Sequence, residues 1–407
     1  MILPAGVAPE ARLLLIGRAL RAGVDGYVAV LLPAYLLALG FGTWEVGLLS
    51  TATLLGSALA TLAVGAWGHR FHHRRLLLAA ALLMAATGFA FASVSTYWPL
   101  LLVAFVGTLN PSSGDVSVFL PLEHARLAEA AQGDARTELF ARYSLTGALC
   151  AAVGSLAAAV PDVLMGQGID RLAALRGMFV AYGGVGLAVW LMYRKLSEPP
   201  PHERPAPPLP LSASRGIVVR LAGLFSVDAF AGGLVVNSLL ALWLFQRFDL
   251  SLAAAGSFFF WAGLLTALSQ LAAPWVARRI GLLSTMVFTH MLANVCLILA
   301  AFASSLPVAL GLLLTRSSLS QMDVPTRSAF VMAVVTPPER AAAASFTAVP
   351  RSLASALSPS LGGALFAAGW LAVPLVACGV LKIAYDLALF VAFRCYRGEG
   401  RQSPRQS

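Results

Sequence analysis

The sequence predicts an all-α integral membrane protein of about twelve transmembrane helices, arranged as two pseudo-repeated bundles of six. Of the 407 residues, 59% are hydrophobic and 11% are charged, whereas a soluble domain carries about 25% charged residues. The apolar residues form runs close to the roughly 20 residues that one helix needs to cross a bilayer. Similar polar residues recur inside corresponding runs of the two halves. The excess of apolar surface must therefore face lipid.

Twelve apolar runs have the length of a membrane-spanning helix. Those of the first half lie near residues 13–39, 44–68, 75–95, 98–121, 138–160 and 173–194. Those of the second half lie near residues 216–245, 252–277, 282–303, 306–329, 340–367 and 370–394. The fifth and eleventh runs carry polar and charged residues near their starts. Because the first run continues into a full-length span, we expect no cleavable signal peptide.

Basic residues are concentrated in every second connection between the runs. The side of the N-terminus has Arg70, Arg74, Arg75, Arg126, Arg136, Arg194, Lys195, Arg204, Arg215, Arg278, Arg279, Arg340 and the tail residues Arg394, Arg397, Arg401 and Arg405. The short loops of the opposite side have Arg171, Arg176 and Arg247. Since positively charged loops remain in the cytoplasm, we expect both termini to be cytoplasmic. Only two of the 28 basic residues are lysines, which is typical of a GC-rich bacterial genome and favours a bacterial inner membrane.

A proline-rich segment separates the sixth run from the seventh. Its proline density excludes a helix and favours an extended spacer. We therefore expect a six-helix bundle at residues 1–194, a cytoplasmic linker at 195–215, a second bundle at 216–394 and a cytoplasmic tail at 395–407.

Matching motifs relate the two halves. Asp25 lies in Gly-Val-Asp-Gly-Tyr near the centre of the first run, and Asp228 lies in Ser-Val-Asp-Ala-Phe near the centre of the seventh. Asp115 of the fourth run is separated from Asp323 of the tenth run by nearly as many residues as Asp25 is from Asp228. A valine follows both Asp115 and Asp323. An internal repeat of six spans is typical of several transporter folds.

The loop after the second run resembles a motif of the major facilitator superfamily, Gly-x-x-x-Asp-Arg-x-x-Arg-Arg in outline. Gly65, Arg70, Arg74 and Arg75 match this motif, whereas His69 replaces its acidic residue. The resemblance covers the whole chain at the level of topology. It implies a transporter built from two six-helix bundles with a cytoplasmic linker.

The resemblance also implies a latch at the cytoplasmic face. In the family, the arginine of the motif pairs with a carboxylate of the fourth helix, which corresponds here to Arg70 and Asp115. The acidic residue of the motif caps a helix N-terminus, whereas a protonated His69 would repel one. In the second half, we expect Asp323 to pair with Arg278 or Arg279, the basic pair that ends the eighth run.

Two carboxylates are predicted near the middle of the membrane. Asp25 and Asp228 each lie about 12 residues into their runs, which corresponds to roughly 18 Å of helix. An ionisable group at this depth costs roughly 2.5–3.5 kcal/mol on insertion scales. The resemblance places the first and seventh helices at a central cavity, where both residues could carry protons or bind a cationic group. Alternatively, Asp25 could neutralise Arg18 or Arg21 on the same helix face.

Other polar residues in the runs have candidate roles. Arg316 is the basic residue nearest to the midplane in the tenth run and could contact an anionic substrate group or a carboxylate. Asn110 precedes a proline in the fourth run and could face the cavity. We expect Arg142 and Arg351 to close the bundle by pairing with Glu123, Asp115 or Asp323.

The spacing of Lys382 and Asp386 predicts an ion pair within the twelfth helix. His290 and Asn294 form a polar turn in the ninth run, and we expect them to form hydrogen bonds between helices. We expect no metal, cofactor or enzymatic activity, because the cysteines lack metal-ligand spacing and no phosphate loop or catalytic triad is present in the sequence. The basic residues form no stripe with interleaved aromatics, which excludes a nucleic-acid surface.

We therefore expect a monomeric transporter that works by alternating access and is driven by protons or another ion. Carboxylates in a cavity suit cations and proton exchange, which slightly favours efflux of amphipathic or cationic small molecules. The first alternative is uptake symport of a small organic solute, which Arg316 and Arg18 would favour if the solute is anionic. The second is a non-transporting receptor or scaffold on the same fold, which would not need paired midplane carboxylates.

Overall fold

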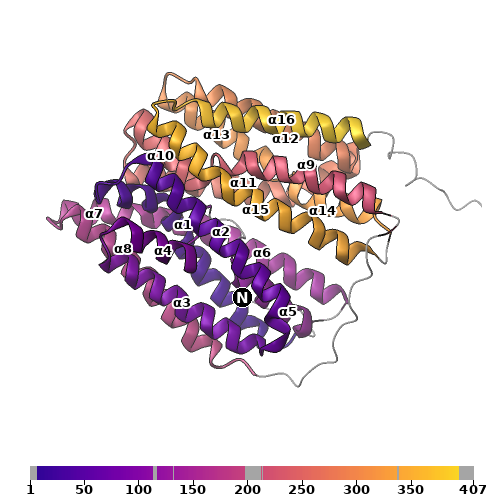
Figure 1. Cartoon of the computed structure of the whole chain (residues 1–407), viewed down its shortest axis with the longest axis horizontal. Helices are drawn as coiled ribbons and strands as arrows, with labels where there is room; N and C mark the ends of the chain where they lie inside the picture. Colours follow the sequence, from indigo (N-terminus) through magenta and orange to yellow (C-terminus); the bar gives the residue numbers. More distant parts are fainter. Residues whose placement is uncertain are drawn as a thin grey trace, which may run out of the picture. The chain divides into compact units, whose positions relative to one another are not determined.

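The computed structural model describes residues 7–112, 117–131, 133–197, 212, 214–336 and 339–393, except for the side chains of His69, Asp134 and Ala341. The secondary structure in these residues is helical, and none of them forms a strand. Figure 1 gives the order of the helices along the chain.

The first half forms the six predicted crossings. They are built from α1 (Ala11–Ala38), α2 (Thr43–Trp67), η1 (Gly68–Arg70), α3 (His73–Ser93), α4 (Tyr97–Val106), α5 (Phe119–Ala130), α6 (Gly133–Ser155), η2 (Leu156–Ala159), α7 (Val160–Gly166) and α8 (Arg171–Tyr193). The fourth crossing consists of two separate helices, α4 and α5. The fifth passes from α6 through the 3-10 turn η2 into α7.

The second half forms six further crossings. They are built from α9 (Arg215–Gly233), α10 (Asn237–Phe248), α11 (Leu252–Ile280), α12 (Leu282–Ala301), α13 (Leu306–Ser320), α14 (Asp323–Val334), α15 (Arg340–Ala367) and α16 (Val373–Phe393). The seventh crossing breaks between α9 and α10, and the tenth between α13 and α14. Each predicted run is thus found as one helix or as consecutive helical pieces, which confirms the all-α class with twelve crossings.

Nine helical segments of the described residues are long and apolar enough to span a membrane by length and composition alone. The fourth, tenth and eleventh crossings are not among them. The fourth and tenth are interrupted, so neither has an unbroken helix of sufficient length. The eleventh, α15, is long, but serines, prolines and glycines dilute its apolar residues.

Contacts between Cα atoms divide the chain into two compact units, which do not coincide with the two sequence halves. The first unit comprises Met1–Arg204, Gly233–Leu264 and Ser355–Pro374. The second comprises Pro205–Gly232, Leu265–Ala354 and Leu375–Ser407. Division at the proline-rich linker into two six-helix bundles therefore stays a prediction.

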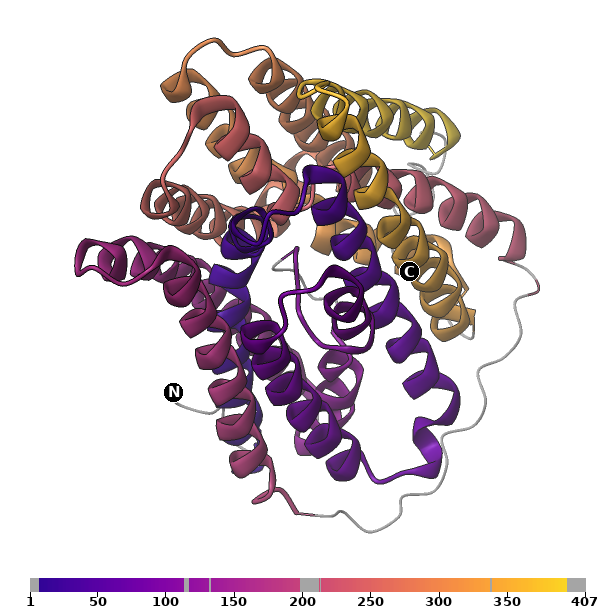
Figure 2. The ribbon, with the colours of Figure 1, turned by 60° about the vertical axis from the view of Figure 1, so that its left-hand side comes forward.

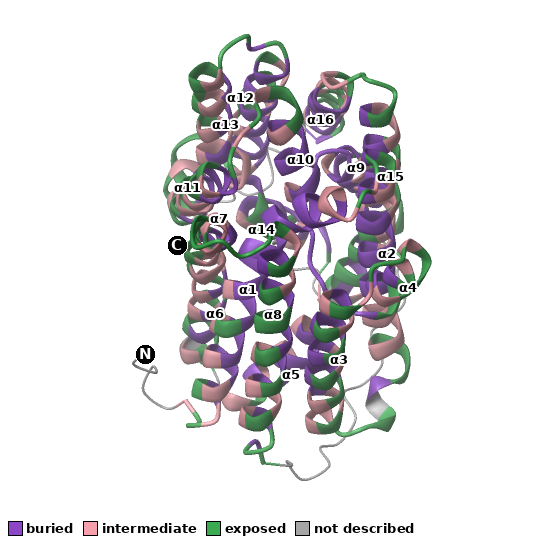
Figure 3. Ribbon diagram, turned by 90° about the vertical axis from the view of Figure 1, so that its left-hand side faces the viewer, coloured by how far each residue is buried: buried purple, intermediate pink, exposed green. Residues whose placement is uncertain are grey.

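In the first unit, α1 is the central helix. It packs against α6, α8 and α10, and most of its residues are buried, as the purple ribbon in Figure 3 shows. Glycines permit the closest of these contacts, because a side chain at Gly26 would collide with the Ala151 carbonyl and one at Gly154 with the backbone of Gly23. Small residues commonly allow such approach between membrane helices. Helices α3 and α8 lie side by side in Figures 1 and 2.

In the second unit, an apolar core joins α9, α12, α14 and α16. Its largest members are Phe225, Phe330, Tyr385 and Phe393, all at most 6% exposed. The same four helices also carry a group of buried charged side chains.

Candidate functional site

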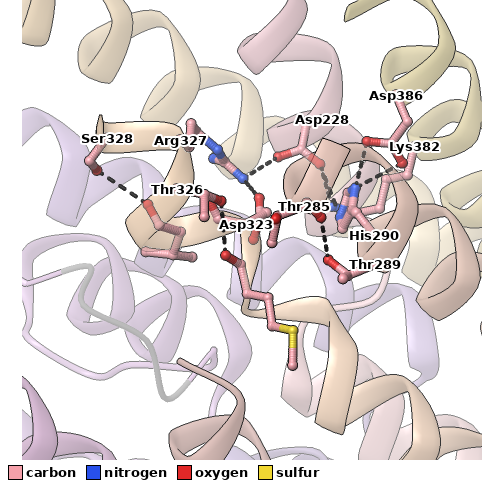
Figure 4. Close-up of polar contacts among 12 residues, drawn as sticks. Asp228, Thr285, Thr289, His290, Asp323, Thr326, Arg327, Ser328, Lys382 and Asp386 are labelled. Carbon is pink, nitrogen blue, oxygen red and sulfur yellow. Dashed lines mark hydrogen bonds and ion pairs between the residues drawn. The ribbon is translucent and has the colours of Figure 1, made fainter. Parts of the chain in front are cut away.

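Charged side chains gather in the interior of the second unit (Figure 4). The members are Asp228 of α9, His290 of α12, Asp323 and Arg327 of α14, and Lys382 and Asp386 of α16. We call these six residues the charge cluster. Each is at most 9% exposed. Charges inside a membrane protein pair with one another because lipid cannot solvate them.

Asp228 is the centre of the charge cluster. Its Oδ1 lies 2.6 Å from Lys382 Nζ, and its Oδ2 lies 3.4 Å from Arg327 Nη2. His290 Nε2 lies 3.7 Å from the same Oδ1. Two cationic side chains therefore pair with this carboxylate. The sequence showed no arginine within a turn of Asp228, because both cations come from other helices.

Asp386 binds His290 rather than Lys382. Both carboxylate oxygens of Asp386 lie 3.0 Å from His290 Nδ1. The expectation of an ion pair within the twelfth helix is corrected, since Lys382 extends from α16 to Asp228 on α9. The predicted bonding of His290 between helices is confirmed, because its partner lies on α16.

Arg327 links Asp228 to Asp323. It forms an ion pair with Asp323, one helical turn earlier on α14, and its guanidinium lies 5.3 Å from the centroid of the Phe225 ring. The expected pairing of Asp323 with Arg278 or Arg279 is not observed. The guanidinium of Arg279 lies instead over a tryptophan ring of its own helix, at 4.3 Å.

Arg316 lies on α13 apart from the charge cluster. Its Nε is buried, and no side chain in the described part of the chain forms a hydrogen bond or an ion pair with this arginine. The groups that act on its charge are the thiols of Cys296 and Cys378, and the charge of Arg316 acts in turn on His290. A permanent cation inside a crossing helix without a carboxylate partner is a candidate contact for an anion.

A second polar cluster lies in the first unit, around Glu123 of α5. This carboxylate is fully buried, and Arg21 Nη2 lies 2.5 Å from it. The hydroxyls of Tyr143 and Tyr193 also donate hydrogen bonds to Glu123. The Arg21 guanidinium lies 3.9 Å from the centroid of the Phe119 ring. Glu123 is thus paired with Arg21 and not with Arg142, which binds Glu138 at 2.5 Å on its own helix.

Asp25 lies one turn after Arg21 on α1 and is 9% exposed. The positive charges of Arg21 and Arg18 both act on it. This environment agrees with the alternative in which Asp25 neutralises buried arginines. Arg18 also lies over the Tyr143 ring, at 5.2 Å from its centroid.

The broken fourth crossing contacts the broken seventh crossing within the first unit. Asn110 is buried, and its Oδ1 accepts hydrogen bonds from the Ser112 amide at 3.1 Å and the Ser112 hydroxyl at 2.8 Å. The Pro111 carbonyl accepts from the Ser238 amide at 3.0 Å, and the Ser112 carbonyl accepts from Asn237 Nδ2 at 2.9 Å. Asn110 therefore shapes the turn, while the freed carbonyls bind the start of α10.

Further contacts join the same ends of other helices of the first unit. The Ser50 and Ser238 hydroxyls are 3.2 Å apart, and the Ser360 amide donates to Thr51 Oγ1 at 2.8 Å. Ser50 and Thr51 lie in the first half of α2 and Ser360 in the second half of α15, away from the end of the first unit where α1 starts.

The predicted latch lies at the other end of the first unit. Gly65, Arg70 and Arg75 are exposed. Arg74 Nη2 donates to the Arg194 carbonyl at 2.7 Å, which ties α3 to the end of α8. Asp115, the expected partner of Arg70, and the side chain of His69 lie outside the described residues.

A buried arginine joins three segments near the latch. Arg126 on α5 binds Glu10 at 3.0 Å, Glu129 at 3.3 Å and the Ser197 carbonyl at 3.0 Å. This residue, rather than Arg70, connects the start of α1 to the segment that follows α8. From the sequence alone, Arg126 was interpreted only as a topology signal.

Glu339 fixes the start of α9 in the second unit. Its carboxylate accepts hydrogen bonds from the Ser212 hydroxyl at 2.6 Å, the Ser212 amide at 2.8 Å and the Ser214 amide at 2.9 Å. These bonds from Ser212, with those from Ser214, hold the pKa of Glu339 well below its usual range. A carboxylate at a helix start is also favoured by the helix dipole.

A cavity of about 200 Å³ lies between α2, α3 and the fourth crossing of the first unit. Its lining is mostly aliphatic, with hydroxyls from Ser57, Thr108 and Ser117. Among the residues the structure describes, no group of three or more histidine, cysteine or acidic side chains could hold a metal ion.

The sequence identified the buried charged residues better than it identified their ion-pair partners. Asp386 and Lys382 were recognised but assigned to each other, and Glu123 was given as one of three possible partners of Arg142 and Arg351, whereas it pairs with Arg21. The available signal was the burial cost of each ionisable group, which requires a partner without saying from which helix.

Comparison with known proteins places this geometry in a family. The sequence matches the Major Facilitator Superfamily over residues 14–322. It is 22% identical over 404 residues to the uncharacterized membrane protein YJR124C of Saccharomyces cerevisiae, covering 90% of each chain. A bacterial homologue of the human lysosomal transporter Spinster, inward-facing and unoccupied, has a similar structure, with a TM-score of 0.75, 15% identity, and coverage of 97% and 98% of the two chains. A D-xylose-proton symporter is similar with a TM-score of 0.71, 15% identity, and coverage of 93% and 96%.

Proposed function

Because the chain belongs to the major facilitator superfamily, we propose that it is a proton-coupled secondary transporter whose substrate carries a negatively charged group. The observation that carries the proposal is Arg316, a cation inside the tenth crossing that no described side chain neutralises. A substrate anion would supply the missing charge.

The same geometry argues against the cationic substrate that the sequence favoured. Asp228 is bound by Lys382 and Arg327, and Asp25 is under the charges of Arg21 and Arg18. A cation approaching either carboxylate would meet two positive side chains. Uptake symport of a small organic anion is therefore better supported than efflux of a cationic compound.

We also propose an orientation of the chain in the membrane, a closed side of the transport path and an oligomeric state. The distribution of basic residues supports cytoplasmic termini, and the scarcity of lysine supports a bacterial inner membrane. The hydrogen bonds that join the start of α10 to the turn after α4 and to α2 would then close the path on the outer side. The loop around Gly65 and Arg70 would act as the cytoplasmic latch, and we propose a monomer as the working unit.

The proposal is tested in proteoliposomes that enclose a pH-sensitive dye. Organic anions, cationic drugs and neutral sugars are added in turn, and proton entry is recorded. We expect one class of anion to move protons. Arg316→Gln should weaken its apparent affinity roughly 10- to 100-fold, as expected for loss of a hydrogen bond to a charged group.

The matched control is Arg220→Gln, which removes an exposed arginine of the same unit and should leave transport unchanged. Transport of a cationic drug with normal activity in Arg316→Gln would reject the anionic substrate. Anion movement without any proton signal would reject proton coupling.

A further inference from the structure

The pair formed by His290 and Asp386 lies between α12 and α16, in crossings that the sequence assigned to structural roles. We propose that this pair binds the coupling proton, and that the bound proton and an anion at Arg316 favour each other. The inference rests on the proposed proton coupling and names its site.

The imidazole of His290 lies between two carboxylates. Its Nδ1 is 3.0 Å from both oxygens of Asp386, and its Nε2 is 3.7 Å from Asp228 Oδ1. A neutral imidazole has one N–H and one lone pair, so one of the two carboxylates must face a lone pair. When a proton from water forms an N–H bond at that nitrogen, both nitrogens carry hydrogen, so that Nδ1 donates to Asp386 and the imidazolium forms an ion pair with Asp228. Release to water breaks the same bond.

Charge balance in the cluster also favours one extra proton. Among the six residues of the charge cluster, Asp228, Asp323 and Asp386 carry three negative charges, whereas Lys382 and Arg327 carry two positive charges. With neutral His290 the cluster has a net negative charge of one. One proton on the pair makes the cluster neutral, which a low-dielectric interior prefers.

The other two carboxylates are less suited to bind this proton. Asp228 has ion pairs with Lys382 at 2.6 Å and Arg327 at 3.4 Å, and Asp323 has its own ion pair with Arg327. An opposite charge at such distances favours the ionised carboxylate. Asp386 has its close contact with His290, a group whose charge can change near neutral pH.

The remaining groups around His290 do not supply a competing acid. Tyr385 of α16 presents its ring edge, with centroids 6.2 Å apart, and the neighbouring Thr289 hydroxyl on α12 donates to the Thr285 carbonyl. Arg351 of α15 is a base, and its charge interacts with Asp228 and Arg327 of the charge cluster. Arg316 of α13 is the cation that acts on His290 from outside the charge cluster.

Arg316 couples the proton to the substrate. Arg316 lies on α13, which packs against α12, the helix that carries His290. A proton on His290 therefore places a second positive charge beside that of Arg316, and the two repel. An anion bound to Arg316 removes the repulsion, so anion binding strengthens proton binding, and by linkage the proton strengthens anion binding by the same factor. Couplings of this kind change affinity roughly 5- to 150-fold.

The proton site is tested with the full-length protein in proteoliposomes on a capacitive membrane sensor, without substrate. A step from about pH 8 to about pH 6 brackets the ordinary histidine pKa, and the charge displaced by proton binding is recorded. We expect displacement in the wild type and its loss in His290→Gln and Asp386→Asn. Asp386→Glu should keep it, with a midpoint within about one pH unit.

A matched control and a charge variant distinguish a change in proton binding from a structural defect of the variant. His124→Gln removes a histidine of the first unit and should leave the displacement intact. Arg316→Gln should move its midpoint to higher pH, because the repelling cation is gone. A structural defect would reduce the amplitude without moving the midpoint in this direction.

The outcomes distinguish the inference from the proposed function. Displacement that survives in His290→Gln and is lost in Asp228→Asn would place the proton elsewhere and overturn the inference, while proton coupling would stand. An unmoved midpoint in Arg316→Gln would reject the coupling to the anion site. No displacement in the wild type would overturn both the inference and the proposed proton coupling.

Discussion

The ion pair between Asp228 and Lys382 should be a measurable source of stability. At an effective dielectric constant of 20, opposite charges 2.6 Å apart attract by about 6 kcal/mol, and the second cation at 3.4 Å adds about 5 kcal/mol. Much of this attraction offsets the loss of hydration. Breaking a buried pair costs 3–5 kcal/mol, and Lys382→Met should lie near about 3 kcal/mol because Arg327 still binds Asp228.

The expected loss converts to a shift in the melting temperature. An unfolding entropy of about 2.1 cal/mol/K per residue gives about 0.85 kcal/mol/K for this chain, so 3 kcal/mol corresponds to about 4 °C. The melting temperature is measured by fluorescence of the purified protein in detergent. Lys195→Met provides the control, because Lys195 is exposed and should leave the melting temperature unchanged.

A double-mutant cycle decides whether the two charges interact. Asp228→Asn removes the other partner, and the double variant should melt above the value expected from adding the two single losses. The coupling should be about 2 kcal/mol or more. Losses that add within about 0.5 kcal/mol would show independent sites and refute the reasoning.

Three further perturbations follow from the same contacts. Glu123→Gln should lower the melting temperature by about 4 °C, since it breaks a buried pair, whereas Glu129→Gln on the same helix should lower it by less than about 1 °C. The depressed pKa of Glu339 contributes stability that is present above the usual carboxyl value of about 4.5 and is lost as pH falls through the folded pKa; Glu339→Gln should therefore lose less stability than wild type on acidification. Asn237→Ala should weaken the contact with the Ser112 carbonyl and increase amide exchange at the start of α10, and unchanged exchange would contradict its role.

Helical crossings could be predicted from the sequence because each depends on a local property. A run such as residues 13–39 is apolar over its whole length, and α1 covers Ala11–Ala38. Breaks within crossings were harder to predict. Gly232 and Gly233 permit the end of α9, but glycines also occur inside intact helices such as α8, so composition alone does not locate a break.

The pairing of buried charges could not be predicted, because it depends on which helix faces meet. The spacing of Lys382 and Asp386 suits a pair within one helix, yet each binds a residue of another helix. Arg21 and Glu123 are 102 positions apart in sequence. Local spacing describes one helix, whereas these contacts depend on packing among four.

The two polar clusters share a construction but differ in charge. In the first unit, α1 supplies the arginine, while α5 supplies the carboxylate Glu123 and the ring that stacks on the arginine. In the second unit these parts are exchanged, because α9 supplies Asp228 and the stacking ring, and α14 supplies Arg327. The order of charges along the repeat is therefore inverted while the pairing is kept.

Because of this inversion, the charge cluster around Asp228 can gain charge balance from a proton, whereas the cluster around Glu123 does not require one. Around Glu123, the negative charges of Glu123 and Asp25 are matched by Arg18 and Arg21, and the tyrosine hydroxyls complete the hydrogen bonds of the carboxylate. In the charge cluster around Asp228, three carboxylates face the two cations Lys382 and Arg327, and the imidazole between two of these carboxylates is the member that can supply a further positive charge. A cluster whose charges already balance is not expected to bind and release a proton in each transport cycle. Proton coupling is therefore expected in the second unit, although the midplane aspartates of both halves appear equivalent in the sequence.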